Sequence, residues 1–415
     1  MVIDNTFTYV DLFAGIGGFH NAMTKFSDKS KCIMACEIDE NARNVYKDNF
    51  DMVPLGDIRK IKPKDVGAFD VLCAGFPCQT FSKAGKQEGF GDPRGTLFYE
   101  IIRLIKFRKR IADRPKILIL ENVHNLVRHD GGKTWRTIKD TIRKTGYNVV
   151  EEPIVIGPKD LGIPQIRDRA IILAVRKDIY NGPITIDFKQ KDRNTTSIYS
   201  IIDERISEDE FKEYSLTQKQ IKLLDCWDDF YHGIKEKVLG TPVWSDEFGK
   251  NYDLTVRDED GNFIIPEWKQ RYIQWNRDLY LNNKEFIDSW YARWDIKSWT
   301  FATDRKFEWQ CGKFNRSVWE GIIQFRTSGI RVKRPTESPT LVTLNHAPAI
   351  GSQRRFITVK EAARLQSFPE NFVFNEPKNE AFKQLGNAVN VDVIEFMFRK
   401  FVSFLEEKDN GNKES

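Results

Sequence analysis

The chain has 415 residues, of which 40% are hydrophobic and 30% are charged, proportions typical of a soluble globular protein. Its apolar stretches, such as AIILAV at 170–175, are far too short to span a bilayer, and its first residues lack the pattern of a signal peptide. We therefore expect a cytoplasmic protein without membrane association, in which a second domain follows or interrupts the first. The net charge of +5 suits an anionic partner such as nucleic acid, although many unrelated proteins share it.

The first 180 residues alternate between strand-like and helix-like segments. Apolar, β-branched runs predict strands, and segments with helical spacing of apolar residues follow most of them. Strands separated by helices of this length indicate an α/β fold with a doubly wound, mostly parallel sheet. The predicted strands span 7–13, 31–39, 69–76, 115–122, 147–156 and 169–176, and the predicted helices span 17–26, 40–50, 96–110 and 133–146.

The composition changes after residue 180. Nine of the ten tryptophans lie between Trp227 and Trp319, and the alternation ends. We interpret this part as a smaller inserted domain, whose tryptophans suit either its core or a nucleic-acid surface. Helical patterns return at 358–368 and 379–407, and the apolar face of the second would pack on the first domain. The predicted parts are 1–180, 181–350 and 351–408, with a disordered tail at 409–415.

The cysteines argue against two kinds of site. They are few and irregularly spaced, which disfavours a disulfide framework, and no Cys/His cluster has the spacing of a zinc site. We therefore expect no structural metal, and Cys32 and Cys36 fit best in a core strand and at its end. The six are Cys32, Cys36, Cys73, Cys78, Cys226 and Cys311.

The glycines after the first predicted strand suggest a cofactor site. Gly15 and Gly17 would let a ligand approach the backbone at the start of a helix. A dinucleotide fingerprint would need glycine at position 20, which is His20, so a nicotinamide oxidoreductase is disfavoured. Glu37 and Asp57 follow neighbouring strand-like segments and could bind the ribose and the adenine amino group of a nucleoside cofactor. Either could instead be a helix cap.

Cys78 follows an apolar strand that ends on Pro77. A lone cysteine at such a place is usually a small hydrophobic residue, because reactivity requires an electropositive site. Glu121, however, follows the next strand and should lie at the same sheet edge. Arg167 and Arg169 alternate in PQIRDR, which would put both on one strand face or make them a solvated pair. A thiolate paired with a carboxylic acid beside a nucleoside cofactor would form a chemical set, in which Cys78 is a candidate nucleophile.

With these segments in place, the sequence resembles the cytosine-C5 DNA methyltransferases of bacterial restriction-modification systems. The resemblance covers roughly residues 8–176 and 355–395, and the family carries its variable target-recognition region between them. It implies the fold of the S-adenosylmethionine-dependent methyltransferases with an inserted target-recognition domain. The matching segments, in the family's order, are DLFAGIGGF, CEID, GDI, GFPCQTFS, GKQEGFGDPRGTLF, ENV, GIPQIRDR, TVKEAARLQSFP and QLGNAV.

The resemblance implies S-adenosylmethionine as the cofactor and a cytosine in double-stranded DNA as the substrate. Cys78 would add to C6 of the base, and Glu121 would contact N3 and the exocyclic amine. Arg169, supported by Arg167, would bond the O2 atom of the base. The implied cofactor-binding residues are Phe13, Gly15, Gly17, Glu37, Asp57, Ile58, Pro77, Leu97 and Asn387.

The resemblance also implies that the base is flipped out, because the target atom cannot be reached inside a duplex. The glycine-rich segment 79–95 would then close over the site. For any basic residue of the variable region, solvated surface charge is an equal alternative to reading guanine. The candidate nucleic-acid contacts are Ser82, Lys86, Arg94, Gln165, Arg331, Arg334 and Thr340, with Arg326 and Lys333 as further basic candidates.

Two alternatives remain within this fold. A relative that methylates tRNA would typically carry a Cys-Phe-Thr signature, which this sequence lacks. A non-catalytic DNA-binding regulator would not need Cys78, Glu121 and the whole cofactor set. The sequence specifies neither the DNA site nor a partner endonuclease, although the resemblance suggests a cognate one, and we expect a monomer.

Overall fold

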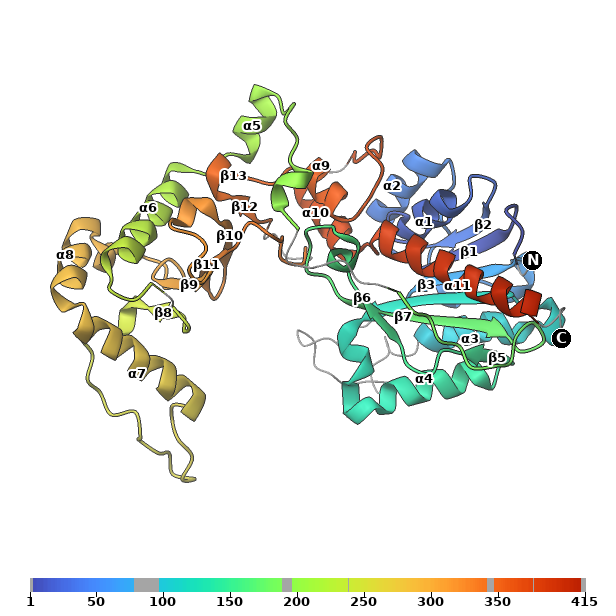
Figure 1. Ribbon diagram of the computed structural model, residues 1–415, viewed down its shortest axis with the longest axis horizontal. Helices are drawn as coiled ribbons and strands as arrows, with labels where there is room; N and C mark the ends of the chain where they lie inside the picture. The colour runs from blue at the N-terminus through green and yellow to red at the C-terminus, as the bar shows by residue number, and fades with distance from the viewer. Residues whose placement is uncertain are drawn as a thin grey trace. The chain divides into compact units, whose positions relative to one another are not determined.

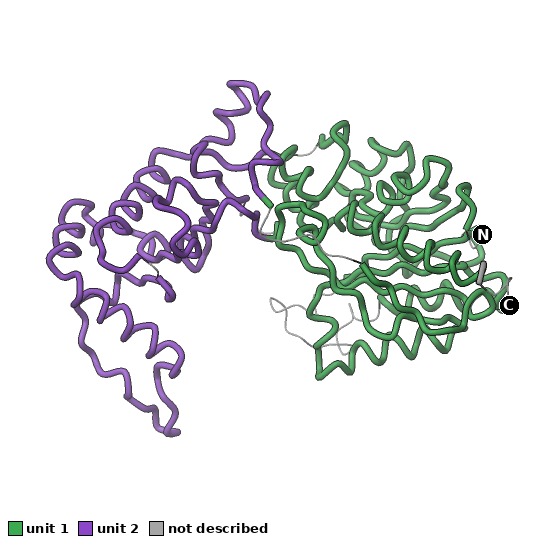
Figure 2. Tube along the Cα trace, viewed as in Figure 1, with its two compact units in different colours: residues 1–196, 340–343, 359–415 green, residues 197–339, 344–358 purple. Residues whose placement is uncertain are grey.

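The computed structural model describes residues 3–77, 97–188, 196–237, 239–341, 347–375 and 377–411. The chain forms two compact units, of which the second interrupts the first (Figure 2). Both boundaries lie farther along the chain than the predicted 180 and 350, because Phe188 packs on Phe396 of the first unit and 355–356 form a strand of the second. The first unit comprises 1–196, 340–343 and 359–415, and the second comprises 197–339 and 344–358.

The first unit contains one mixed sheet in the order β2-β1-β3-β4-β7-β5, with β6 also paired to β7. Strands β2, β1, β3 and β4 are parallel, whereas β7 is antiparallel to β4, β5 and β6. The α/β prediction is confirmed, and β7 runs opposite to its neighbours after a connection, 157–168, that contains no α-helix. The strands are β1 Thr8–Leu12, β2 Lys31–Cys36, β3 Val71–Gly75, β4 Ile117–Val123, β5 Tyr147–Val149, β6 Ile154–Ile156 and β7 Arg169–Arg176.

Helices cover both faces of this sheet, so its central strands consist mostly of apolar residues. Residues 71–74, 117–120 and 170–175 are completely buried. Figure 1 shows α11 beside α1 on one side of the sheet and α4 on the other. The helices are α1 Gly18–Phe26, α2 Glu40–Phe50, α3 Leu97–Phe107, α4 Lys133–Arg143, α9 Val359–Leu365, α10 Lys378–Asn387 and α11 Val391–Gly411.

The last helix returns the chain to the first unit. Phe398 lies in its apolar face and contacts the rings of Phe7 and Phe26, so the predicted packing of this helix is confirmed. The predicted tail at 409–415 begins too early, because α11 continues to Gly411 and so includes its first residues. The buried residues of the face are Ile394, Met397, Phe398, Phe401 and Leu405.

The second unit has a sheet in the order β13-β12-β10-β11-β9-β8. One face of this sheet and helices α6 and α8 enclose an aromatic core in which Trp227 stacks on Phe307. Trp290 and Trp309 are also buried there, whereas Trp268 is 53% exposed. The elements are α5 Glu208–Tyr214, α6 Gln218–Gly233, β8 Val243–Trp244, α7 Glu267–Asn282, α8 Lys284–Trp294, β9 Lys306–Gln310, β10 Ile322–Arg326, β11 Gly329–Lys333, β12 Ala349–Ile350 and β13 Arg355–Phe356.

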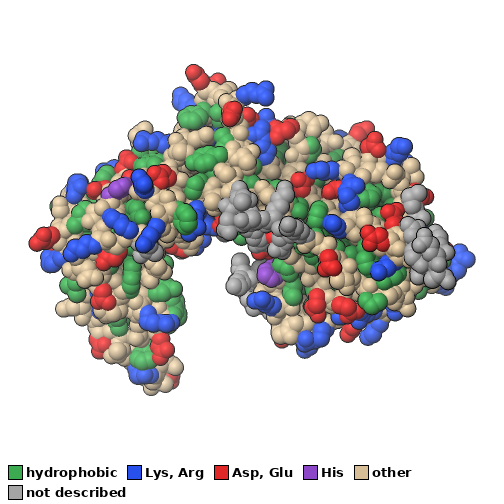
Figure 3. Space-filling model, in the orientation of Figure 1, with side chains coloured by type: hydrophobic (Ala, Val, Ile, Leu, Met, Phe, Trp, Pro, Cys, Tyr) green, Lys and Arg blue, Asp and Glu red, His purple; other side chains and the backbone are tan. Residues whose placement is uncertain are grey.

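Two further observations concern the surface and the helices. On the face shown in Figure 3, Lys and Arg side chains are interspersed with Asp and Glu, so this face carries no continuous basic surface. Within the described ranges, no helix combines the length and apolar character that crossing a membrane requires.

Candidate active site

The turn after β1 brings backbone amides to the carboxyl edge of the sheet. Phe13, Gly15 and Gly17 all have positive φ angles, of 57°, 53° and 91°, so the chain turns sharply before α1. The amide of Gly15 donates to Oε2 of Glu37 at 2.8 Å. A Cβ atom on Gly15 would meet nothing within 4 Å, so space lies open above this turn. The turn therefore offers a backbone surface for a ligand.

Glu37, just after β2, accepts hydrogen bonds from the backbone of two turns, the one after β1 and the one before α2. Besides bonding Gly15, it accepts from the amide of Asp39 at 2.8 Å through Oε1. Asp39, and not Glu37, caps helix α2, because its Oδ1 accepts from the amide of Ala42. The alternative interpretation of Glu37 as a helix cap is therefore wrong. Its carboxylate lies beside the glycine turn, and its role at the ribose hydroxyls stays a prediction.

Asp57 lies next to the end of β2, because the preceding Leu55 pairs with Ala35 and Glu37. It caps the short helical turn Ile58–Lys60, and Arg59 pairs with its carboxylate at 2.6 Å. The bonds from Arg59 hold the pKa of Asp57 below its ordinary value. A cofactor amino group would therefore share this carboxylate with Arg59. Ile58 is buried beside it.

The segment after α10 lies against the glycine turn and the end of β3. A Cβ atom on Gly18 would lie 2.6 Å from Cγ2 of Val389, and one on Gly75 would lie 3.5 Å from Cγ1. Asn387, the last residue of α10, is exposed close by in the chain. Residues from both ends of the sequence thus meet at one sheet edge.

Glu121 and Arg169 form an ion pair at this edge. Strand β7 runs antiparallel to β4, so its first residue, Arg169, lies at the carboxyl end of β4. Nε of Arg169 is 2.9 Å from Oε1 of Glu121, and the side chains are 19% and 12% exposed. Glu121 also pairs in register with Gly75 at the end of β3. The chain reaches Pro77 two residues later, and Cys78 lies outside the described residues.

Arg167 does not share the position of Arg169. It is 3% exposed, and its guanidinium donates to the carbonyl oxygens of Leu341, Gly386 and Ala388 at 3.3, 3.0 and 2.8 Å. Burial, with the charge of Arg169, lowers the pKa of Arg167 well below its ordinary range. Arg167 precedes β7, so the expectation that both arginines share one strand face is wrong. It is a positioning residue that holds the segment around Asn387.

Residues 7–403 match the family described as C-5 cytosine-specific DNA methylase. The type II methyltransferase M.AluI of Cellulosimicrobium cellulans is 32% identical, over 95% of this chain and 92% of its own. M.HhaI of Haemophilus parahaemolyticus is 42% identical, over 94% and 92%. The chain belongs to this family. It is therefore a DNA (cytosine-5)-methyltransferase of the restriction-modification type. The Dnmt2 methyltransferase of S. pombe superimposes with a TM-score of 0.53 over 97% of this chain and 99% of its own, but at 18% identity it shows the fold alone.

Several predicted nucleic-acid contacts of this methyltransferase have internal partners. Arg331 bonds Glu308, Arg334 bonds the carbonyl of Cys311 at 3.2 Å, and the hydroxyl of Thr340 donates to the carbonyl of Ile166. The side chain of Gln165 is completely buried, and neither of its polar atoms has a hydrogen-bond partner among the described residues, so its contact with nucleic acid stays a prediction. Ser82, Lys86 and Arg94, like Cys78, lie outside the described residues.

Two residues of the methyltransferase were missed by sequence reasoning. Asn122 is 1% exposed and donates from Nδ2 to the carbonyl of Phe76 at 3.1 Å, which joins the ends of β4 and β3 just before Pro77. Asp11 is completely buried in β1, and burial together with the charge of Glu37 raises its pKa well above the ordinary value. A polar residue inside an apolar strand was the available signal for Asp11. For Asn122 it was the polar pair that ends β4.

Within the described ranges, the methyltransferase contains no group of three or more His, Cys, Asp and Glu side chains arranged to hold a metal ion. The cysteines in these ranges, Cys32, Cys36, Cys73, Cys226 and Cys311, are buried and free.

Proposed function

We propose that this methyltransferase transfers a methyl group from S-adenosylmethionine to C5 of a flipped-out cytosine in a specific double-stranded DNA sequence. The Glu121–Arg169 pair carries the proposal. The pairing edge of cytosine presents O2, N3 and the exocyclic amine in a row. A guanidinium beside a carboxyl group matches that row, with Arg169 at O2 and Glu121 at N3 and the amine.

The residues at the sheet edge fit the cofactor. Open space above Gly15, a glycine turn at the start of α1 and the carboxylate of Glu37 suit a nucleoside with an attached amino acid. Phe13, Gly17, Asp57, Ile58, Pro77, Leu97 and Asn387 would complete the pocket. S-adenosylmethionine, when bound, supplies a methyl group on a positively charged sulfur.

The chain's own residues would make C5 nucleophilic. The sulfur of Cys78 forms a bond to C6, and the electrons of the C5–C6 double bond become available at C5. Glu121 exchanges a proton at N3 as charge develops in the ring, and Arg169 fixes the base through O2. After C5 is methylated, loss of its proton and cleavage of the carbon–sulfur bond restore the aromatic ring and release Cys78.

The relatives named as type II methyltransferases support a role in modification. We propose that the enzyme acts as a cytoplasmic monomer, protecting DNA from a separate cognate endonuclease. Ser82, Lys86 and Arg94 would contact the DNA from the segment that follows Cys78.

Trapping with 5-fluorocytosine tests the mechanism, because fluorine at C5 cannot leave as a proton does. We expect an adduct between the wild-type enzyme and a duplex that carries this base in the target sequence, and none with Cys78→Ala. Bisulfite sequencing of DNA from expressing cells identifies that target first. Methylation of tRNA in place of duplex DNA, or methyl transfer by Cys78→Ala, would overturn the proposal.

A further inference from the structure

The sheet of the second unit has two chemically different faces. Phe307, Trp309, Ile323, Ile330 and Val332 are buried in the core with residues of α6 and α8. Because side chains alternate along a strand, their neighbours point to the opposite side. We call that side the polar face. Its residues on β9, β10 and β11 include Glu308, Gln324, Arg326, Arg331 and Lys333.

The register of these strands puts three polar residues in one row. Arg331 of β11 is paired with Gln324 of β10 on one side and with Glu308 of β9 on the other. Arg326 lies two residues beyond Gln324 and therefore on the same face. Residues from three neighbouring strands thus form one contiguous cluster.

Glu308 fixes both arginines of this cluster. Its Oε2 accepts from Nε of Arg331 at 3.0 Å and also from Nη2 of Arg326. The side chains of Glu308, Arg326 and Arg331 are 20%, 19% and 27% exposed. Two cations share one anion, so the cluster keeps a net positive charge while the planes of its guanidinium groups are held.

Two buried polar atoms of the cluster lack a partner among the described residues. They are Nε of Arg326, a hydrogen-bond donor, and Oε1 of Gln324, an acceptor. Buried polar groups are normally hydrogen-bonded, so two such atoms on one face of β10 point to a ligand that supplies both an acceptor and a donor. The edges of bases do so in the major groove, where arginine bonds O6 and N7 of guanine and glutamine bonds N6 and N7 of adenine.

Contact with the phosphate backbone is less suited to this cluster. The carboxylate of Glu308, which lies between the two guanidinium groups and accepts from both, repels a phosphate. Contacts with the phosphate backbone of DNA need positive charge but little orientation of the side chain. Here, by contrast, one carboxylate fixes the orientation of two guanidinium groups. The chemistry therefore favours bases over phosphates.

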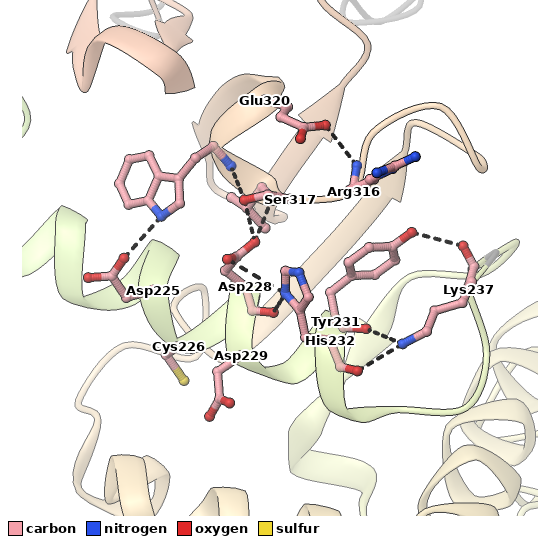
Figure 4. A network of polar contacts seen from close by, with 12 residues as sticks. Asp225, Cys226, Asp228, Asp229, Tyr231, His232, Lys237, Arg316, Ser317 and Glu320 are labelled. Atoms are coloured by element: carbon pink, nitrogen blue, oxygen red, sulfur yellow. Dashed lines mark hydrogen bonds and ion pairs between the residues drawn. The ribbon is translucent and has the colours of Figure 1, made fainter.

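Helix α6 supports β10 from the apolar side of the sheet. Oδ1 of Asp228 accepts from the hydroxyl of Ser317 and the amide of Val318 at 2.8 and 2.7 Å, and Asp225 accepts from the indole of Trp319 at 3.0 Å (Figure 4). The turn Val318–Glu320 leads directly into β10. The strand that carries Gln324 and Arg326 is therefore fixed at its start.

We propose that the polar face reads base edges of the DNA target, and that Glu308 is the positioning residue that orients Arg326 and Arg331 toward guanine. The proposal rests on the proposed function, since it assigns specificity to the same methyl transfer. Glu308 acts through the arginines and does not take part in the chemistry.

The test compares discrimination between DNA sequences, which a purely structural ion pair would not alter. Once the target is known, kcat/KM is measured for full-length enzyme on the cognate duplex and on duplexes with single base-pair changes. Glu308→Gln should lower discrimination at a guanine-containing position about tenfold or more. Asp288→Asn, which removes the charge that pairs with Lys284 on α8, should leave all ratios unchanged. An equal loss of kcat/KM on every duplex would overturn the proposal.

Arg331→Lys provides a second, independent test of the proposal if Glu308→Gln fails to fold. Lysine keeps the charge but cannot bond a base bidentately, so we expect lost discrimination with unchanged affinity for non-specific DNA. Replacing the guanine read by Arg331 with 7-deazaguanine should slow the wild type and have little effect on this variant. Weaker binding to all sequences, with a shallower salt dependence, would instead indicate a phosphate contact and overturn the proposal. A wild type that methylates no duplex would contradict the proposed function itself, before any variant is compared.

Discussion

Nε of Arg169 and Oε1 of Glu121 lie 2.9 Å apart, which joins the first residue of β7 to the carboxyl end of β4. The contact exists because β7 is antiparallel to its neighbour and so begins where β4 ends. The mixed sheet thereby puts a carboxyl group and a guanidinium group side by side, next to the strand that leads to Cys78.

Replacing Glu121 by glutamine should therefore damage the chemical step. Glu121→Gln keeps the shape of the side chain but removes the group that exchanges a proton at N3. We expect kcat to fall about 10²–10⁴-fold with unchanged cofactor affinity, measured by single-turnover methyl transfer and by calorimetry. Glu151→Gln, at an exposed ion pair with Lys139 and Arg143, is the control and should retain full activity. Normal turnover by Glu121→Gln would contradict this role.

Removing the Asn122 side chain should affect both stability and catalysis. Asn122→Ala leaves the carbonyl of Phe76 without its bond from Nδ2. We expect the free energy of unfolding to fall by about 1–3 kcal/mol, and kcat to fall as well because the segment before Cys78 loses its anchor. Urea unfolding and initial rates measure the two effects. Asn375→Ala, which loses only an exposed bond to Asp48, should change neither.

A methyl group on Gly17 should destabilise the turn before α1. Gly17 has a φ of 91°, and an added Cβ would lie 2.2 Å from the ring of Phe50. Gly17→Ala should cost about 2–4 kcal/mol, because the strained backbone and the steric conflict add together. Gly131→Ala, at a φ of 57° in open space, isolates the backbone term and should cost only about 1–2 kcal/mol. Equal losses in thermal unfolding would show that the Phe50 ring moves aside freely.

Local sequence predicted the first four strands because each is rich in apolar and β-branched residues and is followed by a turn or a helix-like segment. The predicted segments 31–39 and 115–122, for example, contain β2 and β4. The direction of β7 could not be read in the same way, because pairing depends on how the chain connects the strands. The motif residues identified the sheet edge, since the carboxyl ends of parallel strands meet there.

The partners of the site residues could not be predicted from the sequence. Arg167 bonds Ala388 and Asn122 bonds Phe76, and neither contact leaves a local pattern because the residues are far apart in the chain. Glu308 was missed for a related reason. Alternation indicates that its side chain shares a face with Lys306 and Gln310 of β9, but not that two arginines of other strands meet there.

The last prediction concerns Asp70, which joins three strands at the amino edge of the first sheet. Its carboxylate accepts from the amide and hydroxyl of Thr8 at 3.0 and 3.1 Å, and Lys116 lies 3.1 Å away. Burial alone would raise the pKa of Asp70, but these bonds outweigh it and hold the pKa below the ordinary value. Asp70 therefore stabilises the fold above the unfolded-state pKa of about 3.9, and this contribution is lost as pH falls through the folded-state value.

Asp70→Asn should cost about 1 kcal/mol at pH 7, a modest figure because solvent screens a partly exposed pair. In urea unfolding, the difference from wild type should stay constant down to about pH 5 and shrink below about pH 4. Asp28→Asn, on an exposed turn, is the control, and a difference for Asp70→Asn that grows on acidification would contradict the assignment.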